Sequence, residues 1–110
     1  MEKTLYDTGI LIEKYRKKIK NLSGYTTILN VVEFPKALKF KGLKIIYPDP
    51  EDYVLALKIS KDLLGIGKPI PTVDIVIASI AIRRELKLET RDKHFANILK
   101  AKYDLKIKII

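Results

Sequence analysis

The sequence predicts an α/β sandwich with a mainly parallel sheet. Short apolar segments alternate along the chain with longer segments of helical periodicity. Strands that alternate with helices are joined by right-handed crossovers and become parallel neighbours. The length of 110 residues suits one compact domain, so we expect residues 1–110 to form a single unit.

The chain is expected to begin with a strand, a turn and a helix. Residues 3–7 are typical of a short buried strand. From Ile10 onward, apolar residues recur at helical spacing as far as Leu22. Gly24 is expected to break this pattern, and residues 25–28 have an extended character.

A second helical segment is predicted from Leu29 to Phe40. Pro35 lies inside it, and proline within a helix removes a hydrogen bond and clashes with the preceding turn. We therefore expect either a kink or a new helix that begins at Pro35. Gly42 ends the segment, and the β-branched residues 43–47 predict the next strand.

The second half of the chain continues the alternation. A third helix, marked by Tyr53, Leu57 and Leu64, is expected to stop at Gly65 and Gly67. The fourth helix, residues 73–84, is apolar almost all round, which predicts that it lies between other elements.

The last three elements are shorter. Residues 86–90 predict a strand, and a final helix is expected from about Asp92 to Lys100. In residues 105–110 Lys alternates with Leu and Ile, which predicts a strand with one buried face.

The charge of the chain favours a polyanionic partner. The formal charge is +9, from 22 Lys and Arg residues against 13 Asp and Glu residues. Such an excess favours nucleic acid through counterion release and electrostatic steering. The alternative is that the basic surface only keeps the protein in solution.

The chain contains no cysteine, which excludes disulfides, thiolate metal sites and a cysteine nucleophile. Neither a signal peptide nor an apolar run long enough for a bilayer is apparent. We therefore expect a cytoplasmic protein without a membrane partner.

Four carboxylates stand apart from the other acidic residues. Asp7 ends the first strand, Glu33 lies in an apolar helical segment, and Asp74 and Asp92 open helices. A carboxylate among apolar residues is costly to bury without a partner or an ion, which makes Glu33 the most unusual of the four. Most other acidic residues, among them Asp49, Glu51 and Asp52, lie among charged residues and are explained by solvation.

Each of the four also has a structural explanation. Asp74 and Asp92 could cap a helix or interact with its dipole, and Asp7 could be an ordinary turn residue. Glu33 could lie at an exposed helix edge. Their convergence favours function, because the carboxyl end of the first strand and the start of the last helix face the same side of a parallel sheet.

Four converging carboxylates would repel one another unless divalent cations neutralised them. Oxygen ligands select Mg²⁺ or Mn²⁺ over zinc. His94, the single histidine, can build neither a zinc site nor the histidine pair of a metal-free ribonuclease. We expect it to be a capping or surface residue.

Four segments together resemble the PIN-domain ribonucleases, specifically the VapC-type toxins of toxin–antitoxin pairs. They are YDTGILIE, ILNVVEF, GKPIPTVDIVIASIA and ETRDKHF, in this order and across nearly the whole chain. The chain differs from many members in having Asn30 where they carry Thr, and only a short stretch between Glu33 and the strand at 43–47.

The resemblance implies a three-layer α/β/α fold and cleavage of RNA that depends on Mg²⁺ or Mn²⁺. Asp7, Glu33, Asp74 and Asp92 would form the acidic, metal-binding cluster. The supporting residues would be Thr8, Asn30 and Thr90, and from its charge Arg91 could bind phosphate. The partners implied are RNA, a cognate antitoxin that blocks the site, and a second copy of the chain in a homodimer.

Three other interpretations compete with the nuclease. Asp7-Thr8-Gly9 is the triplet of aspartic proteases, but those use an all-β framework, whereas here an amphipathic helix follows. A phosphatase would need a second Asp at position 9, which is Gly. The remaining alternative is a basic, non-enzymatic α/β module that binds RNA or protein, with the carboxylates as helix caps.

Overall fold

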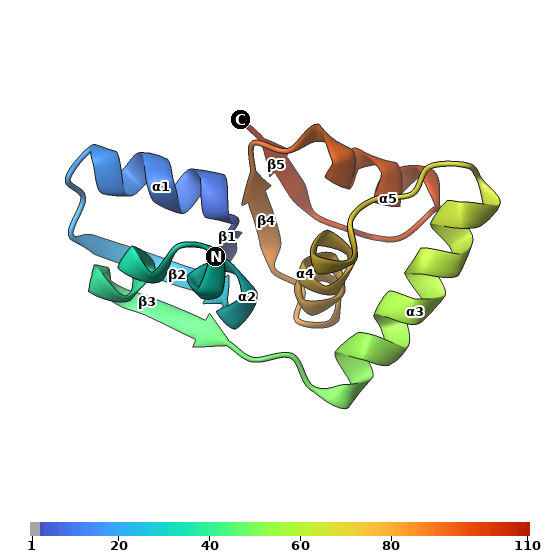
Figure 1. Cartoon of the computed structure of the whole chain (residues 1–110), viewed down its shortest axis with the longest axis horizontal. Helices are drawn as coiled ribbons and strands as arrows, with labels where there is room; N and C mark the ends of the chain where they lie inside the picture. The colour runs from blue at the N-terminus through green and yellow to red at the C-terminus, as the bar shows by residue number, and fades with distance from the viewer. Residues whose placement is uncertain (1–2) are drawn as a thin grey trace.

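The computed structural model describes residues 3–110, and it contains a five-stranded sheet in which every strand pair is parallel (Figure 1). The order across the sheet is β3-β2-β1-β4-β5. The strands are β1 (Thr4–Tyr6), β2 (Asn21–Thr27), β3 (Lys41–Ile46), β4 (Lys87–Thr90) and β5 (Ile107–Ile109). The chain moves outward from β1 through β2 to β3 and then returns to the other side of β1, so the direction in which strands are added to the sheet reverses between β1 and β4.

Helices connect the strands. The elements that follow β1 and β2 are α1 (Thr8–Arg16), α2 (Ile28–Glu33) and the short 3₁₀ helix η1 (Pro35–Lys39). The elements that follow β3 and β4 are α3 (Pro50–Gly65), α4 (Thr72–Arg83), the 3₁₀ turn η2 (Lys93–Phe95) and α5 (Ala96–Lys100). Figure 1 shows α1 and α2 grouped with β2 and β3, and α3, α4 and α5 grouped with β4 and β5.

Two hydrophobic cores lie on opposite faces of the sheet. Consecutive residues of β1 divide between them, because side chains alternate along a strand: Leu5 is buried with the α3–α5 core, and Tyr6 packs against the α1–η1 core. The predicted three-layer α/β/α sandwich with a parallel sheet is confirmed. So is the inner position of α4, in which all seven residues from Ile75 to Ala81 are buried.

Proline and glycine signals located two boundaries. Of the two alternatives expected at Pro35, a kink or a new helix, the structure has the new helix, because η1 starts at this residue. Gly67 follows the end of α3 with a φ of 68°, a left-handed conformation that suits glycine. The predicted stop of this helix at the glycines is therefore confirmed.

The predicted end of the first helix is wrong. The helix ends at Arg16, and Lys18 then takes the left-handed conformation with a φ of 61°. The Lys18 and Ile19 N–H groups donate to the Tyr15 and Lys14 carbonyls, the pattern of a Schellman motif. Because a lysine occupies the position where glycine is usual, the sequence carried no stop signal. Leu22, expected in this helix, belongs to β2.

Gly24 also differs from its prediction, since it lies within β2 and does not end a structural unit. Its φ is 135°, and a Cβ atom at this position would lie 2.7 Å from the ring of Tyr6. Glycine is required here because the neighbouring strand carries an aromatic side chain across it. Sequence periodicity could not reveal this cross-strand contact.

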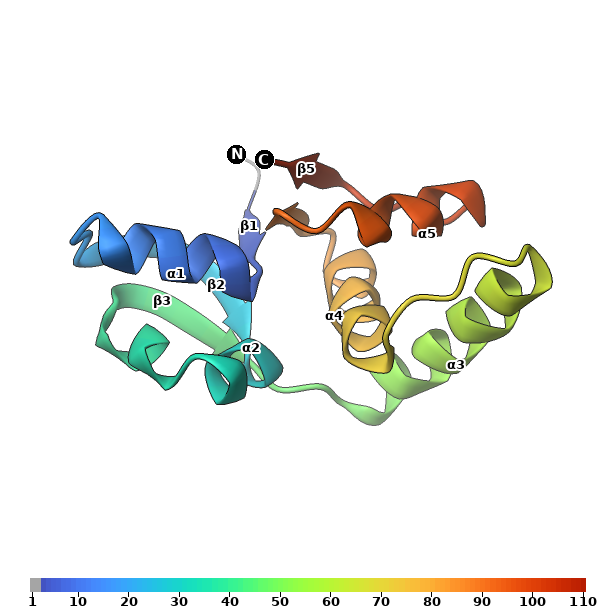
Figure 2. The same ribbon diagram turned by 45° about the horizontal axis from the view of Figure 1, so that its top comes forward.

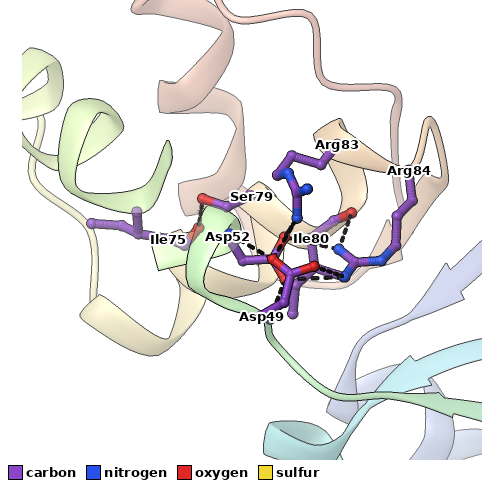
Figure 3. A network of polar contacts seen from close by, with 7 residues as sticks. All are labelled: Asp49, Asp52, Ile75, Ser79, Ile80, Arg83 and Arg84. Atoms are coloured by element: carbon purple, nitrogen blue, oxygen red, sulfur yellow. Dashed lines mark hydrogen bonds and ion pairs between the residues drawn. The ribbon is translucent and has the colours of Figure 1, made fainter. Parts of the chain in front are cut away.

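The interpretation of Asp52 as a solvated residue is wrong. Asp52 is fully buried at the start of α3, where it accepts hydrogen bonds from Arg83 and Arg84 at the end of α4 (Figure 3). Asp49 and Asp52 also form a reciprocal capping box at the start of α3. These contacts join α3 to α4, two helices that are close in sequence but separated by a loop.

Candidate active site

The sequence candidates gather at the carboxyl ends of β1 and β4, the neighbouring strands between which the strand order reverses. In parallel α/β sheets, ligands bind at this kind of position. Asp7 follows β1, and its N–H donates to the Glu89 carbonyl in β4 at 3.0 Å. Thr90 ends β4, so Asp7 and Thr90 come together from positions 83 residues apart.

Both carboxylate oxygens of Asp7 accept a hydrogen bond. Thr90 donates its hydroxyl to Oδ2 at 2.7 Å, and the side-chain amide of Asn30 donates to Oδ1 at 3.0 Å. Thr90 and Asn30 are fully buried, so they hold the carboxylate in one orientation. The same Thr90 oxygen accepts from the N–H of Asp92 at 3.0 Å, which ties the two aspartates to one hydroxyl.

Asn30 is positioned by a capping box at the start of α2. Its Oδ1 atom accepts from the Thr27 hydroxyl at 2.7 Å and from the Thr27 N–H at 3.2 Å. Two donors on one atom identify it as the amide oxygen, which leaves Nδ2 facing Asp7 and Thr8. Thr27 is thus a supporting residue that was missed, although Thr-x-x-Asn before an apolar helix carries the signal of a capping box.

Glu33 joins the site through Thr8. The Thr8 hydroxyl accepts from Asn30 Nδ2 at 2.9 Å and donates to Glu33 Oε1 at 3.1 Å. The Glu33 side chain is exposed at the end of α2, which is the structural alternative noted for it. Its connection to Asp7 therefore depends on hydrogen bonds and not on an apolar environment.

Asp74 is the most perturbed carboxylate of the four. It lies half-buried in the first turn of α4. Its pKa is raised to about 6, mostly by burial and further by repulsion from Asp7, Asp92 and Glu33, while His94 opposes the shift. All three other candidates therefore lie within electrostatic reach of Asp74, although α4 is remote from them in sequence.

Asp92 and His94 occupy the rim of this group. Asp92 caps η2 by accepting a hydrogen bond from the His94 N–H at 2.9 Å. The helix-capping role considered for Asp92 is therefore present in the structure, and it does not exclude a role in the site. His94 is exposed, as predicted, but its ring nitrogen Nδ1 also lies 2.8 Å from Asp92 Oδ1. The sequence interpretation had placed His94 outside the site.

Arg91 does not contact the carboxylate group. Its guanidinium pairs with Glu13 on α1, and its aliphatic stem lies against Gly9. The group formed by Asp7, Glu33, Asp74 and Asp92 thus has no arginine or lysine ion pair within the described residues 3–110. It is an accumulation of negative charge on a protein of net charge +9.

The donor set fits a hard divalent cation. Its free donors are carboxylate oxygens, and their mutual repulsion would be relieved by a bound cation. Among residues 3–110, no three acidic or histidine side chains are arranged to contact one ion directly. Mg²⁺ commonly binds through only one or two carboxylates and keeps several waters, so this spacing is compatible with it.

Comparisons with known proteins place the chain in a family. No protein-family model matches it. Ribonuclease VapC1 of Methanocaldococcus jannaschii is 32% identical, over 87% of this chain and 81% of the relative. Among solved structures, DNA-bound VapBC from Salmonella typhimurium has a TM-score of 0.79 at 18% identity, covering 99% of this chain and 98% of that one.

A second structural match gives the same fold. VapBC-5 from Mycobacterium tuberculosis, a member of the VapBC family of toxin–antitoxin systems, has a TM-score of 0.74 at 16% identity and covers 100% of this chain and 98% of that one. The structural matches establish the fold, and the curated relative, whose identity and coverage are high enough, establishes the family. The predicted resemblance is confirmed: this chain belongs to the VapC family of ribonucleases.

Proposed function

We propose that this chain is the endoribonuclease toxin of a toxin–antitoxin pair, and that it hydrolyses RNA phosphodiesters with Mg²⁺ or Mn²⁺ held by Asp7, Glu33, Asp74 and Asp92. The observation that carries the metal dependence is the raised pKa of Asp74, about 6, among three other carboxylates without a neighbouring arginine or lysine ion pair. Such uncompensated charge is the property of a site that receives a cation.

The bound metal would supply an activated water and would stabilise the charge on the leaving oxygen. The chain's own residues prepare the site. Thr90 and Asn30 fix both oxygens of Asp7, and Thr8 orients Glu33. Because these hydrogen bonds are formed before substrate arrives, the carboxylates need little reorganisation.

The excess positive charge elsewhere complements RNA. A chain with formal charge +9 attracts a polyanion, while the carboxylate group repels phosphate until a cation is present. RNA should therefore bind the metal-free chain but be cleaved only after metal addition. The proposed role of Arg91 in holding phosphate would require release from Glu13, its partner in this structure.

The test is cleavage of a single-stranded and a structured RNA by the purified chain, with Mg²⁺, Mn²⁺ or chelator. We expect cleavage only with metal, and Asp7→Asn or Asp92→Asn should lower the rate at least about 100-fold. Glu51→Gln, at an exposed acidic position on α3, is the matched control and should retain full activity.

Two results would contradict the proposal. Cleavage that persists in chelator would exclude metal dependence, and cleavage that survives both aspartate substitutions would exclude the assigned site. Binding of RNA without turnover in either metal would favour the non-enzymatic binding module. Circular dichroism of each variant separates loss of activity from loss of fold.

An antitoxin partner and a homodimer belong to the same proposal. The two solved structures of similar fold named above are of VapBC toxin–antitoxin proteins, which supports an antitoxin that binds this chain. Co-expression with the product of the adjacent gene should yield a complex that no longer cleaves RNA. Light scattering of the chain alone tests the homodimer.

The cytoplasmic location stays a prediction. Within residues 3–110, none of the helices has both the length and the apolar character needed to cross a membrane.

A further inference from the structure

Arg91 lies between two residues of the candidate site and yet pairs with none of its four carboxylates. Thr90, directly before it, donates its hydroxyl to Asp7, and the N–H of Asp92, directly after it, donates to Thr90. The Arg91 side chain instead crosses to α1, which contacts β4 (Figure 2). Its Cβ, Cγ and Cδ atoms lie 3.6 to 3.8 Å from the place that a Cβ on Gly9 would take, so the side chain runs over the first turn of α1.

Glu13, one helical turn beyond Gly9, receives the guanidinium of Arg91. The ion pair and hydrogen bond join Arg91 Nη1 to Glu13 Oε2. Both side chains are open to solvent, and the ammonium group of Lys17 lies 3.4 Å from the other Glu13 oxygen. Within residues 3–110, Glu13 is the only carboxylate that pairs with Arg91. A single exposed carboxylate therefore holds this arginine at the edge of the site.

A carboxylate and an RNA phosphate present the same feature to an arginine. Each has two oxygens that share the negative charge, and the planar guanidinium can bind both oxygens at once. Exposed ion pairs contribute little to stability, because water solvates both groups well when they separate. A phosphate can therefore replace Glu13 on Arg91 at little cost to the fold.

The pair also has a structural explanation, in which it ties α1 to the segment that follows β4. The two explanations predict opposite effects of Glu13→Gln on RNA affinity. Loss of a tie would loosen the edge of the site and weaken binding, whereas loss of a competitor would free Arg91 and strengthen it. The second is favoured, since the start of α1 is already joined to β4 by the Asp7 N–H, which donates to the Glu89 carbonyl.

We propose that Glu13 occupies the phosphate-binding position on Arg91 in the free protein, and that a backbone phosphate of RNA displaces it. Arg91 is then a substrate-binding residue, and Glu13 is a positioning residue that acts through Arg91 and lowers the affinity for RNA. The proposal rests on the proposed function, because it takes RNA as the substrate, and it adds a competitor that belongs to the chain itself. A contact to phosphate carries no sequence information, so the effect should be the same for RNAs of different sequence.

The test measures RNA binding and RNA cleavage separately. Binding is followed by fluorescence anisotropy of two labelled single-stranded RNAs with the whole chain in chelator, and cleavage by kcat and KM in Mg²⁺. Glu13→Gln should lower both Kd and KM at least about threefold and leave kcat within about twofold. The slope of log Kd against log salt should steepen by about 0.7, the value for one further phosphate contact on a single strand.

Two controls isolate the contribution of Arg91. Glu85→Gln changes the net charge equally at an exposed position before the amino end of β4, the opposite edge of the sheet from Arg91, and should change Kd by less than about 1.5-fold. In an Arg91→Gln background, Glu13→Gln should have no larger effect than Glu85→Gln, because the arginine it would free is absent. This double-mutant cycle also accounts for Lys17, which Glu13→Gln releases in either background.

Three outcomes would overturn the inference. Equal gains in affinity from Glu13→Gln and Glu85→Gln would show an effect of net charge alone. A gain that persists in full in the Arg91→Gln background would show that Arg91 does not receive the phosphate. Weaker RNA binding or a lower kcat after Glu13→Gln would identify the pair as a structural tie.

The result is separable from the nuclease proposal. Tighter RNA binding that requires Arg91, in a chain that never cleaves RNA, would leave the exchange intact and contradict the proposed nuclease mechanism. Cleavage that requires metal and Asp7, with no change in KM after Glu13→Gln, would leave the mechanism intact and contradict the exchange.

Discussion

Two groups of carboxylates in this molecule have opposite electrostatic environments. Asp52 is fully buried, and although burial raises its pKa, hydrogen bonds from Arg84, the Asp49 backbone and Arg83 outweigh that effect and lower it (Figure 3). Asp74 is only half-buried, yet its pKa is raised to about 6, first by that burial and then by repulsion from its acidic neighbours, with no arginine hydrogen bond to offset them. Burial alone therefore does not distinguish a structural carboxylate from a functional one, whereas the presence of a cationic partner does.

The largest expected effect on stability comes from Asp52, the carboxylate that is paired with arginines. Asp52→Asn leaves two arginines without their shared buried anion, and we expect the free energy of unfolding to fall by about 3 kcal/mol. Urea denaturation at pH 7 measures this change. Asp49→Asn is the matched control, since Asp49 binds the same arginines from an exposed position, and its loss should be smaller. An equal loss of unfolding free energy in both variants would show that the burial of Asp52 does not strengthen its pairing with the arginines.

An aspartate-to-asparagine substitution at Asp74, which has no cationic partner, should raise the free energy of unfolding instead of lowering it. Asp74→Asn removes a carboxylate that is repelled by its neighbours, so the metal-free chain should gain roughly 1–2 kcal/mol of stability at pH 8. The gain should shrink as the pH falls from 6 towards 4 and disappear below the ordinary pKa of 3.8, where Asp74 is protonated in both the folded and the unfolded state. Thermal denaturation in chelator provides the measurement, and destabilisation at pH 8 would contradict the electrostatic interpretation.

The stability of the unmodified chain should depend on pH in two opposite ways, one from Asp74 and one from Asp49 and Asp52. The pKa of Asp74, about 6, lies above its ordinary value of 3.8, so its unfavourable contribution is lost as the pH falls from above 6 towards 4. The pKa values of Asp49 and Asp52 lie below 3.8, so the stability they contribute is present above pH 4 and lost in stronger acid. Metal-free stability should therefore be greatest between about pH 4 and 6.

Added Mg²⁺ sharpens this comparison. A bound cation stabilises ionised Asp74, so Mg²⁺ should raise the melting temperature at pH 8 more than at pH 5. The acid-side loss from Asp49 and Asp52 should not change, because these residues pair with arginines. A uniform Mg²⁺ effect at every pH would indicate binding elsewhere on the chain.

The smallest expected effect concerns the ion pair at the rim of the site. Arg91 and Glu13 are both solvent-exposed, with 56% and 42% of their side-chain surfaces accessible. Exposed pairs contribute little, so Glu13→Gln should change the unfolding free energy by less than about 1 kcal/mol. A larger loss, measured by urea denaturation, would mean that this pair also compensates the carboxylate group.

The sequence identified the acidic residues better than it explained them. Asp7, Glu33, Asp74 and Asp92 were selected from strand ends, helix starts and an apolar context, and the fold brings all four into electrostatic reach. The apolar sequence context of Glu33 does not bury this residue, which is exposed and connects to the site through Thr8. Asp52 was dismissed because its sequence neighbours are charged, although Arg83 and Arg84, which bury it, lie about 30 residues away. The assignment of roles to the four residues remains a prediction.

By itself, the sequence determined the alternation of strands and helices, the parallel sheet, the inner position of α4 and the start of η1 at Pro35. These features depend on periodicity and on proline, which act within a few residues. The tertiary structure alone decided where α1 ends, why Gly24 must be glycine, and which carboxylates acquire cationic partners. Those outcomes depend on the neighbouring strand at Gly24, a lysine in a left-handed conformation at Lys18 and the packing of α4 on α3 at Asp52, and local sequence patterns do not encode such contacts.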